Sequence, residues 1–227
     1  MGRTILLSSP FARFFSLKMT SKIDTFISNF DRALRVINGQ ARASRALPGG
    51  DLEDTSMTEI ERKHAAGLMR VNHVGEICAQ ALYDSQAVFT RQQAVRAQFK
   101  HSEIEEEDHL AWTAKRLEEL NSHTSLLNPF WYVGAYACGL VAGACGDEVS
   151  LGFVVETEKQ VEAHLEGHLE QLPAQDQKSR AIVDQMRIDE IAHGDAAQKL
   201  GAQEMPLPVK IAMKAMAKVM TSTAYHI

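Results

Sequence analysis

The stretch HSEIEEEDHLAW, residues 101–112, places five acidic residues in six positions directly before a histidine. Most acidic runs of this kind form the solvated face of a helix. Glu106 nevertheless falls on an apolar stripe with Phe99 and Leu110, and His109 follows it by three positions. Residues three apart share one helix face, with Cβ atoms about 5–6 Å apart, so both side chains can bind one ion. We expect the other acids of the stretch to face solvent: Glu103, Glu105, Glu107 and Asp108.

Apolar residues recur with a helical period through nearly the whole chain, which predicts an all-α fold. No segment alternates with a period of two. Helix boundaries are indicated by a capping box, by N-cap residues and by proline and glycine stops. These signals are Thr58-x-x-Glu61, Thr90-x-x-Gln93, Asn128-Pro129, Asp147, Pro173 and Gly201.

Each of the four long predicted helices carries a glutamate on its apolar stripe: Glu76, Glu106, Glu158 and Glu190. Burying a lone ionised carboxylate destabilises the folded state by several kcal/mol, so such a residue needs a partner that is buried with it. Glu76 and Glu106 are 30 positions apart, and Glu158 and Glu190 are 32 apart. If each pair spans a helical hairpin with nearly equal arms, both of its glutamates reach the same level.

The second glutamate of each pair belongs to a Glu-x-x-His motif, Glu106 with His109 and Glu190 with His193. Composition alone predicts about 0.7 such motifs by chance, the usual risk with short patterns. A further match, Glu61-x-x-His64, has no hairpin partner, and Glu61 is better explained by the capping box.

Two glutamate helices and two Glu-x-x-His helices form the ligand set of ferritin-like, carboxylate-bridged dimetal bundles. Imidazole and carboxylate ligands without thiolate favour iron or manganese. The sequence therefore predicts a four-helix bundle with a dimetal core held by Glu76, Glu106, His109, Glu158, Glu190 and His193. His73 and His164 are candidates to orient these ligands by hydrogen bonds.

Four stretches together resemble the demethoxyubiquinone hydroxylases of ubiquinone biosynthesis, in particular the bacterial branch. They are RVNHVGEICAQALY (70–83), EEEDHLAW (105–112), ETEKQVEAHL (156–165) and RIDEIAHGDAA (187–197), and the likeness extends over about residues 20–227. The resemblance implies a ferritin-like bundle whose di-iron centre uses the same six residues, with Glu158 six positions ahead of His164.

The implied reaction is hydroxylation of the ring of a polyprenyl demethoxyubiquinol by O2. The resemblance further implies two iron ions, an external reductant with NADH as its ultimate source, and an association with other proteins of ubiquinone biosynthesis. The chain shows no GxGxxG after a predicted strand, and therefore no dinucleotide domain of its own.

A polyprenyl substrate requires the enzyme to reach a membrane. Residues 129–146 are uncharged and are expected to form an apolar crossover helix, which is either an interfacial or re-entrant membrane element or a plain core helix. Lys210, Lys214 and Lys218 recur every four residues on a C-terminal amphipathic helix, which suits an anionic membrane surface as well as a solvated face. We expect a peripheral protein of the cytoplasmic face of the bacterial inner membrane.

Residues 1–18 are basic and lack acids, so they are either a targeting segment or an extension outside the fold. A mitochondrial location, on the matrix side of the inner membrane, remains an alternative. Residues 19–57 are expected to form a helix and a linker, and residues 58–227 the hydroxylase domain. The net charge of −5 gives no case for nucleic-acid binding.

Two alternatives stay open at this point. A ferritin- or rubrerythrin-like protein would handle iron or peroxide, although the CxxC pairs typical of a rubrerythrin are absent from the sequence. A helical scaffold protein without catalysis would leave the four glutamates on apolar stripes unexplained.

Overall fold

The structure is a computed structural model that describes residues 31, 34–37 and 41–227. Within these residues there is no strand, so the all-α prediction is confirmed. The helices are α2 (Glu59–Phe89), α3 (Gln93–Glu119), α4 (Asn128–Ala144), α5 (Asp147–Gln171), α6 (Gln177–Lys199) and α7 (Leu207–Ala224). Residues 1–30, which include the proposed extension and most of the predicted N-terminal helix, lie outside the described residues.

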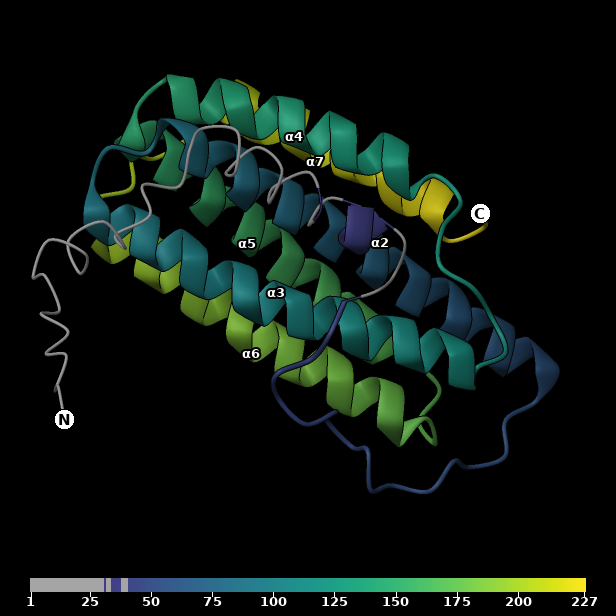
Figure 1. The fold of residues 1–227 in the computed structure, drawn as a ribbon. Coiled ribbons are helices and arrows are strands. Elements are labelled where there is room, and N and C mark those ends of the chain that lie inside the picture. Colours follow the sequence, from purple (N-terminus) through teal and green to yellow (C-terminus); the bar gives the residue numbers. More distant parts are fainter. Residues whose placement is uncertain (1–30, 32–33, 38–40) are drawn as a thin grey trace, which may run out of the picture.

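Helices α2, α3, α5 and α6 form a four-helix bundle made of two hairpins, α2–α3 and α5–α6 (Figure 1). The hairpins meet where α3 packs on α6 and α2 on α5. Two apolar layers fill the bundle. One contains Met69, Leu117 and Met186, and the other contains Tyr83 and Phe99. The four stripe glutamates lie between these layers along the sequence of each helix, so the predicted polar level is enclosed from both ends.

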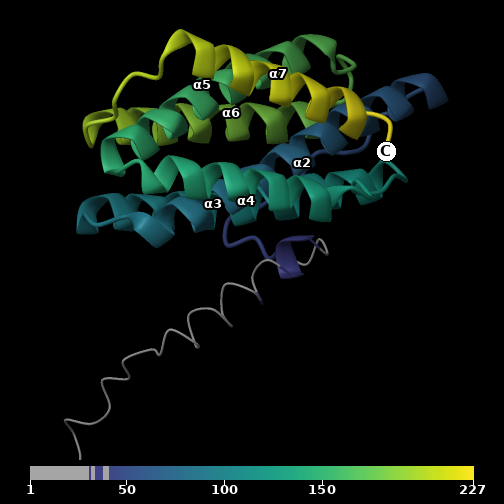
Figure 2. The ribbon, with the colours of Figure 1, turned by 90° about the horizontal axis from the view of Figure 1, so that it is seen from above.

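Helix α4 crosses over between the two hairpins and packs against α2, while α7 covers α2 from the same side of the bundle (Figures 1 and 2). Close approach of α4 to α2 depends on small residues, because a Cβ on Gly139 would overlap the Ser85 hydroxyl. The Tyr132 hydroxyl donates to an Asp84 carboxylate oxygen at 3.2 Å. None of the helices in the described part of the chain is long and apolar enough to cross a membrane.

The predicted helix boundaries are correct at three places. Thr58 and Glu61 form the capping box that begins α2, and α5 ends just before Pro173. Gly201 follows the last residues of α6 with φ of 97°, a conformation that glycine adopts without steric cost.

The predicted caps at Thr90, Asn128 and Asp147 are wrong. Thr90 is the C-cap of α2, and Asn128 lies inside α4, whose N-cap is Leu127. The Asp147 carboxylate accepts hydrogen bonds from the backbone N–H groups of Arg91 and Gln92, in the turn that leads into α3, and the N-cap of its own helix is Gly146. Sequence signals for caps assume a local partner, whereas this carboxylate bonds to a segment that is distant in the sequence.

Residues 41–57 form an irregular segment, here called the strap, which crosses α3 and α6 on the outside of the bundle (Figure 1). At its far end Asp54 pairs with Arg116 of α3 and Lys178 of α6, with N–O distances of 2.8 and 3.2 Å. Near its start Ser44 and Arg45 bond to Asp108. The sequence predicted only a linker here; the structure adds that it is docked along its length. The division into residues 19–57 and 58–227 stays a prediction.

Candidate metal centre

The structure brings all six predicted ligands together at the centre of the bundle. They form two groups whose ligand atoms lie within 4.8 Å of one another, and every member is buried. One group is Glu76, Glu106, His109 and Glu190; the other is Glu106, Glu158, Glu190 and His193. Because Glu106 and Glu190 belong to both groups, the arrangement fits two adjacent ions with two bridging carboxylates.

The two histidines present Nδ1 to this cluster. His109 Nδ1 is 3.5 Å from a Glu76 oxygen and 3.4 Å from a Glu106 oxygen. His193 Nδ1 is 3.3 Å from oxygens of both Glu106 and Glu190. The Nδ1 atoms are therefore the ones available to an ion.

The opposite nitrogens of the two histidines are held by carboxylates that the sequence analysis missed. His109 Nε2 lies 2.9 Å from Asp189 of α6, and His193 Nε2 lies 2.8 Å from Glu105 of α3. Each carboxylate thus supports the histidine of the other helix and fixes its tautomer. The available signal was the acid directly preceding each Glu-x-x-His motif.

The expectation that the acids flanking Glu106 are solvated is wrong for Glu103, Asp108 and, in part, Glu105. Glu103 and Asp108 are buried, and the Glu105 side chain is only 20% exposed. Asp108 is covered by the strap, and Glu103 pairs with Lys100 at 2.8 Å. The sequence could not predict the burial of Asp108, because the strap that covers it has no helical or strand period.

Burial and mutual repulsion shift the ionisation of the cluster. Burial, with the nearby Glu106 charge, raises the pKa of Glu76 well above its usual range, and burial together with Glu190 does the same for Glu158. Burial alone would raise the pKa of Glu106, but Glu76, His109 and His193 lower it well below its usual range. For His109, burial is outweighed by Asp189 and the glutamates, so its pKa is raised. Protons therefore reduce the repulsion in the metal-free cluster.

The chemistry of these donors fits divalent metal ions. Both carboxylate oxygens of Glu106 and the Nδ1 atom of His109 are fully buried and lack a partner in hydrogen-bond geometry among the described residues. Buried polar atoms without partners are rare in native proteins, and an ion is one explanation for them. Four carboxylates and two imidazoles match two divalent ions in charge.

His73 and His164 lie outside both groups. His73 is fully buried, neither of its ring nitrogens has a hydrogen-bond partner among the described residues, and burial lowers its pKa to about 4. Burial also lowers the pKa of His164 to about 4, and its ring lies against His168 with centroids 3.9 Å apart. Their role in orienting ligands stays a prediction.

Tyr83 is a further partner of the cluster that the sequence did not predict. Its hydroxyl donates to a Glu158 oxygen at 2.7 Å. A cavity of about 10 Å³ lies beside this pair, between α2 and α5, and is also lined by Leu82 and Val154. This volume is close to that of one water-sized sphere.

The fold and the cluster define the class of the protein: a ferritin-like helical bundle with a buried cluster of carboxylates and histidines suited to binding metal. The chain belongs to the family described as "Ubiquinone biosynthesis protein COQ7", which it matches over residues 63–224. The resemblance to bacterial demethoxyubiquinone hydroxylases is confirmed.

Several bacterial relatives carry the name 3-demethoxyubiquinol 3-hydroxylase. The relative from Herbaspirillum seropedicae is 65% identical over 205 residues, which are 90% of this chain and 99% of that protein. The relative from Burkholderia cenocepacia is 60% identical over 206 residues, with the same coverage. A third, from Polynucleobacter necessarius, is 60% identical over 208 residues, covering 91% of this chain and the whole of that protein. Membership of this family sets aside the iron-storage, peroxide-scavenging and scaffold alternatives.

Proposed function

We propose that this chain hydroxylates the ring of a polyprenyl demethoxyubiquinol with O2, as a di-iron monooxygenase of ubiquinone biosynthesis. The observation that carries the proposal is the pair of buried ligand groups that share Glu106 and Glu190. In the reaction a ring C–H becomes C–OH, the other oxygen atom of O2 leaves as water, and an external reductant, with NADH as its ultimate source, supplies the electrons. Two bound iron ions would supply the redox change and the open coordination positions for O2.

The six buried side chains divide naturally between two ions. Glu76 and His109 would hold one ion, and Glu158 and His193 the other. Glu106 and Glu190 would bridge both. Asp189 and Glu105 keep the histidine Nδ1 atoms directed at the ions by holding the Nε2 atoms.

A small cavity lies beside Tyr83 and Glu158, between α2 and α5, next to the buried cluster. Its volume of about 10 Å³ suits a small gas molecule better than a quinol ring. We propose that the ring enters on this side when Leu82 and Val154 move apart. Tyr83 then keeps the Glu158 carboxylate in place through its hydrogen bond.

Helices α4 and α7 are proposed to rest on the membrane that holds the substrate. Both lie on one side of the bundle over α2, and both expose large apolar side chains (Figure 2). Phe130 and Val133 of α4 are each 66% exposed, and Ile211 and Val219 of α7 are 60% and 62% exposed. Such helices bind at a bilayer interface without crossing it. The bacterial relatives agree with a bacterial setting, in which we propose that this surface meets the cytoplasmic face of the inner membrane.

The reaction is tested with iron-loaded, reduced protein, a short-chain demethoxyquinol and ¹⁸O₂. We expect mass spectrometry to find one labelled oxygen in the hydroxylated ring, and no product with Glu106→Gln. Label arriving from water, or equal turnover by the variant, would contradict the proposal.

Membrane binding is tested separately by sedimentation with anionic vesicles, where Ile211→Glu should release the protein and Ile60→Glu, on α2, should not.

A further inference from the structure

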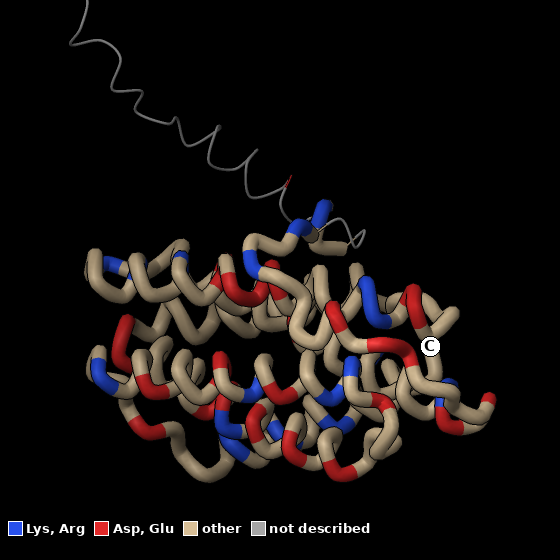
Figure 3. Tube along the Cα trace, turned by 90° about the horizontal axis from the view of Figure 1, so that it is seen from below, with Lys and Arg blue, Asp and Glu red and all other residues tan. Residues whose placement is uncertain are grey.

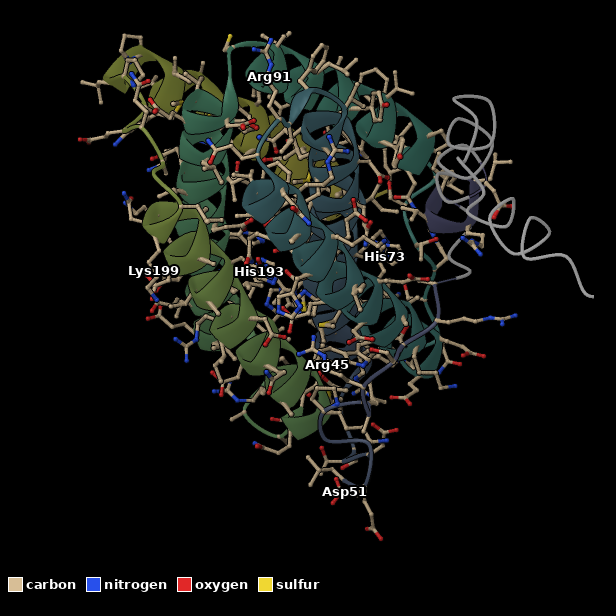
Figure 4. All side chains as sticks on the ribbon, turned by 60° about the vertical axis from the view of Figure 1, so that its left-hand side comes forward. Arg45, Asp51, His73, Arg91, His193 and Lys199 are labelled. Atoms are coloured by element: carbon tan, nitrogen blue, oxygen red, sulfur yellow. The ribbon has the colours of Figure 1, made fainter. Side chains whose placement is uncertain are left out.

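One arginine of the strap contacts both of the carboxylates that hold the histidines. Arg45 Nη1 lies 2.9 Å from an Asp189 oxygen and 3.5 Å from a Glu105 oxygen. Asp189 supports His109, and Glu105 supports His193. A single guanidinium therefore joins the supports of both halves of the cluster, which come from different helices. Figure 4 shows Arg45 and His193 in this region, where the strap passes α3 and α6.

The position of Arg45 is fixed by further contacts. Its Nε donates to Asp108 at 2.6 Å, and its guanidinium carbon lies 4.8 Å from the centre of the Trp112 ring. The same Trp112 ring lies 5.4 Å from the ring of His109. A planar guanidinium can hold several carboxylates at once and stack on an aromatic ring, which an ammonium group does less well.

The charges around Arg45 show why a cation is needed there. Glu105, Asp108 and Asp189 converge on the outer side of the two histidines, and only 33% of the Arg45 side chain is exposed. Acidic and basic positions are otherwise interspersed along the chain (Figure 3). Without Arg45 the three carboxylates would repel one another, and both histidine supports would lose the one cation that joins them, although Gln185 also donates to Asp189 at 2.9 Å.

The strap delivers Arg45 from outside the bundle. The backbone N–H of Arg45 donates to Asp108 at 3.3 Å, and the hydroxyl of Ser44 donates to the same carboxylate at 3.2 Å. Nine residues after Arg45, the pairing of Asp54 with Arg116 and Lys178 anchors the other end of the strap. Arg45 therefore both docks the strap on α3 and contacts the carboxylates that hold the two histidines of the cluster.

We propose that Arg45 is a positioning residue of the metal centre: through Asp189 and Glu105 it holds both histidines, so that docking of the strap sets the affinity of both metal positions. This inference rests on the proposed function. It adds that the strap, a segment outside the four helices of the bundle, affects the affinity of both metal positions together.

The test is a titration of the full-length, metal-free protein with Co²⁺, followed by visible absorption, for wild type, Arg45→Gln and Arg45→Lys. Arg42→Gln is the matched control, because Arg42 is also on the strap but is exposed. We expect Arg45→Gln to weaken both Co²⁺ sites by about tenfold to a hundredfold and to change the spectrum, the effect usual for partners of metal ligands. Arg45→Lys should recover part of the affinity, and Arg42→Gln should behave as wild type. Thermal unfolding of each metal-free variant reports whether the fold is intact.

The outcomes separate this inference from the proposed function. Wild-type affinity and spectrum in Arg45→Gln would overturn the inference alone, as would weakening of only one site. If Arg45→Gln does not fold, Arg45→Lys decides, and a spectrum identical to wild type would count against the inference. A wild-type protein that binds no stoichiometric Co²⁺ would overturn the inference and the proposed function together.

Discussion

The two hairpins of the bundle perform the same task with unequal surroundings. In α2–α3 and in α5–α6 alike, one helix gives a glutamate and the next a Glu-x-x-His motif. The unshared glutamates differ, because Glu158 accepts a hydrogen bond from Tyr83 whereas Glu76 has His109 at 3.5 Å. The histidine supports differ as well: the Asp189 side chain is 9% exposed and the Glu105 side chain 20%. The repeated pattern of a glutamate followed by a Glu-x-x-His motif therefore defines the ligand set. The different partners of the glutamates and histidines predict that the two halves bind their ions with different affinity.

Replacing a residue that both halves share should have the largest effect. Glu106→Gln removes the charge from one of the two carboxylates common to both groups, so we expect binding of both ions to fail. The metal-free variant should unfold at a lower temperature, because His109 and His193 hold the pKa of Glu106 below its usual range and the substitution removes this favourable charge from the folded state. Iron analysis and calorimetry measure the two effects. Retention of one firmly bound ion would show that Glu106 is not shared.

Replacing the histidine supports one at a time should separate the halves. We expect Asp189→Asn to weaken metal binding by about tenfold to a hundredfold. Glu105→Gln should have a smaller effect, because the Glu105 side chain is more exposed and water can replace part of its hydrogen bond to His193. Co²⁺ titration of both variants gives the comparison. A larger loss for Glu105→Gln would reverse the assigned order.

Acidity should affect both halves in the same direction. The pKa values of Glu76, Glu158 and His109 are all raised, by burial with neighbouring charges for the glutamates and by carboxylate partners for the histidine, so these groups hold protons more tightly in the metal-free protein than exposed groups do. An ion must displace protons from these groups, so metal affinity should fall as the pH is lowered. Calorimetric titration in buffers of different ionisation enthalpy counts the released protons. Binding without proton release would contradict the assignment.

The hydrogen bond from Tyr83 should give the smallest effect, limited to one half. Tyr83→Phe leaves the aromatic contact with Phe99, whose ring centre is 5.6 Å away, but removes the donor to Glu158. We expect the affinity of one ion to fall about threefold to tenfold, the usual value of a single hydrogen bond. The other ion should bind as in wild type. Equal weakening of both ions would mean that Tyr83 acts on the whole bundle.

The helical period and two spacings were enough to predict the bundle and the meeting of its six buried side chains. Glu76 and Glu106, or Glu158 and Glu190, reach one level because hairpin arms of similar length must do so. The uncharged run of residues 129–146 also indicated the apolar crossover helix, which is α4. These predictions succeeded because regular helices convert a distance along the sequence into a distance in space.

The support of the cluster could not be predicted in the same way. Arg45 lies in a segment without a period, and its partners Asp108 and Asp189 are 63 and 144 positions away. Asp147 similarly bonds to the backbone of the turn before α3, more than 50 positions earlier. In both cases a long-range contact decides which acids are solvated, and no local pattern contains that information.

The most direct test of the central claim is the iron content per chain of protein purified without oxygen, for wild type and for Glu158→Ala. Two ligand groups that share Glu106 and Glu190 predict about two iron ions per wild-type chain. The iron content should fall sharply in the variant, because it loses the unshared glutamate of one group. No stoichiometric iron in the wild type, or iron unchanged by Glu158→Ala, would contradict the assignment of this cluster as a dimetal centre.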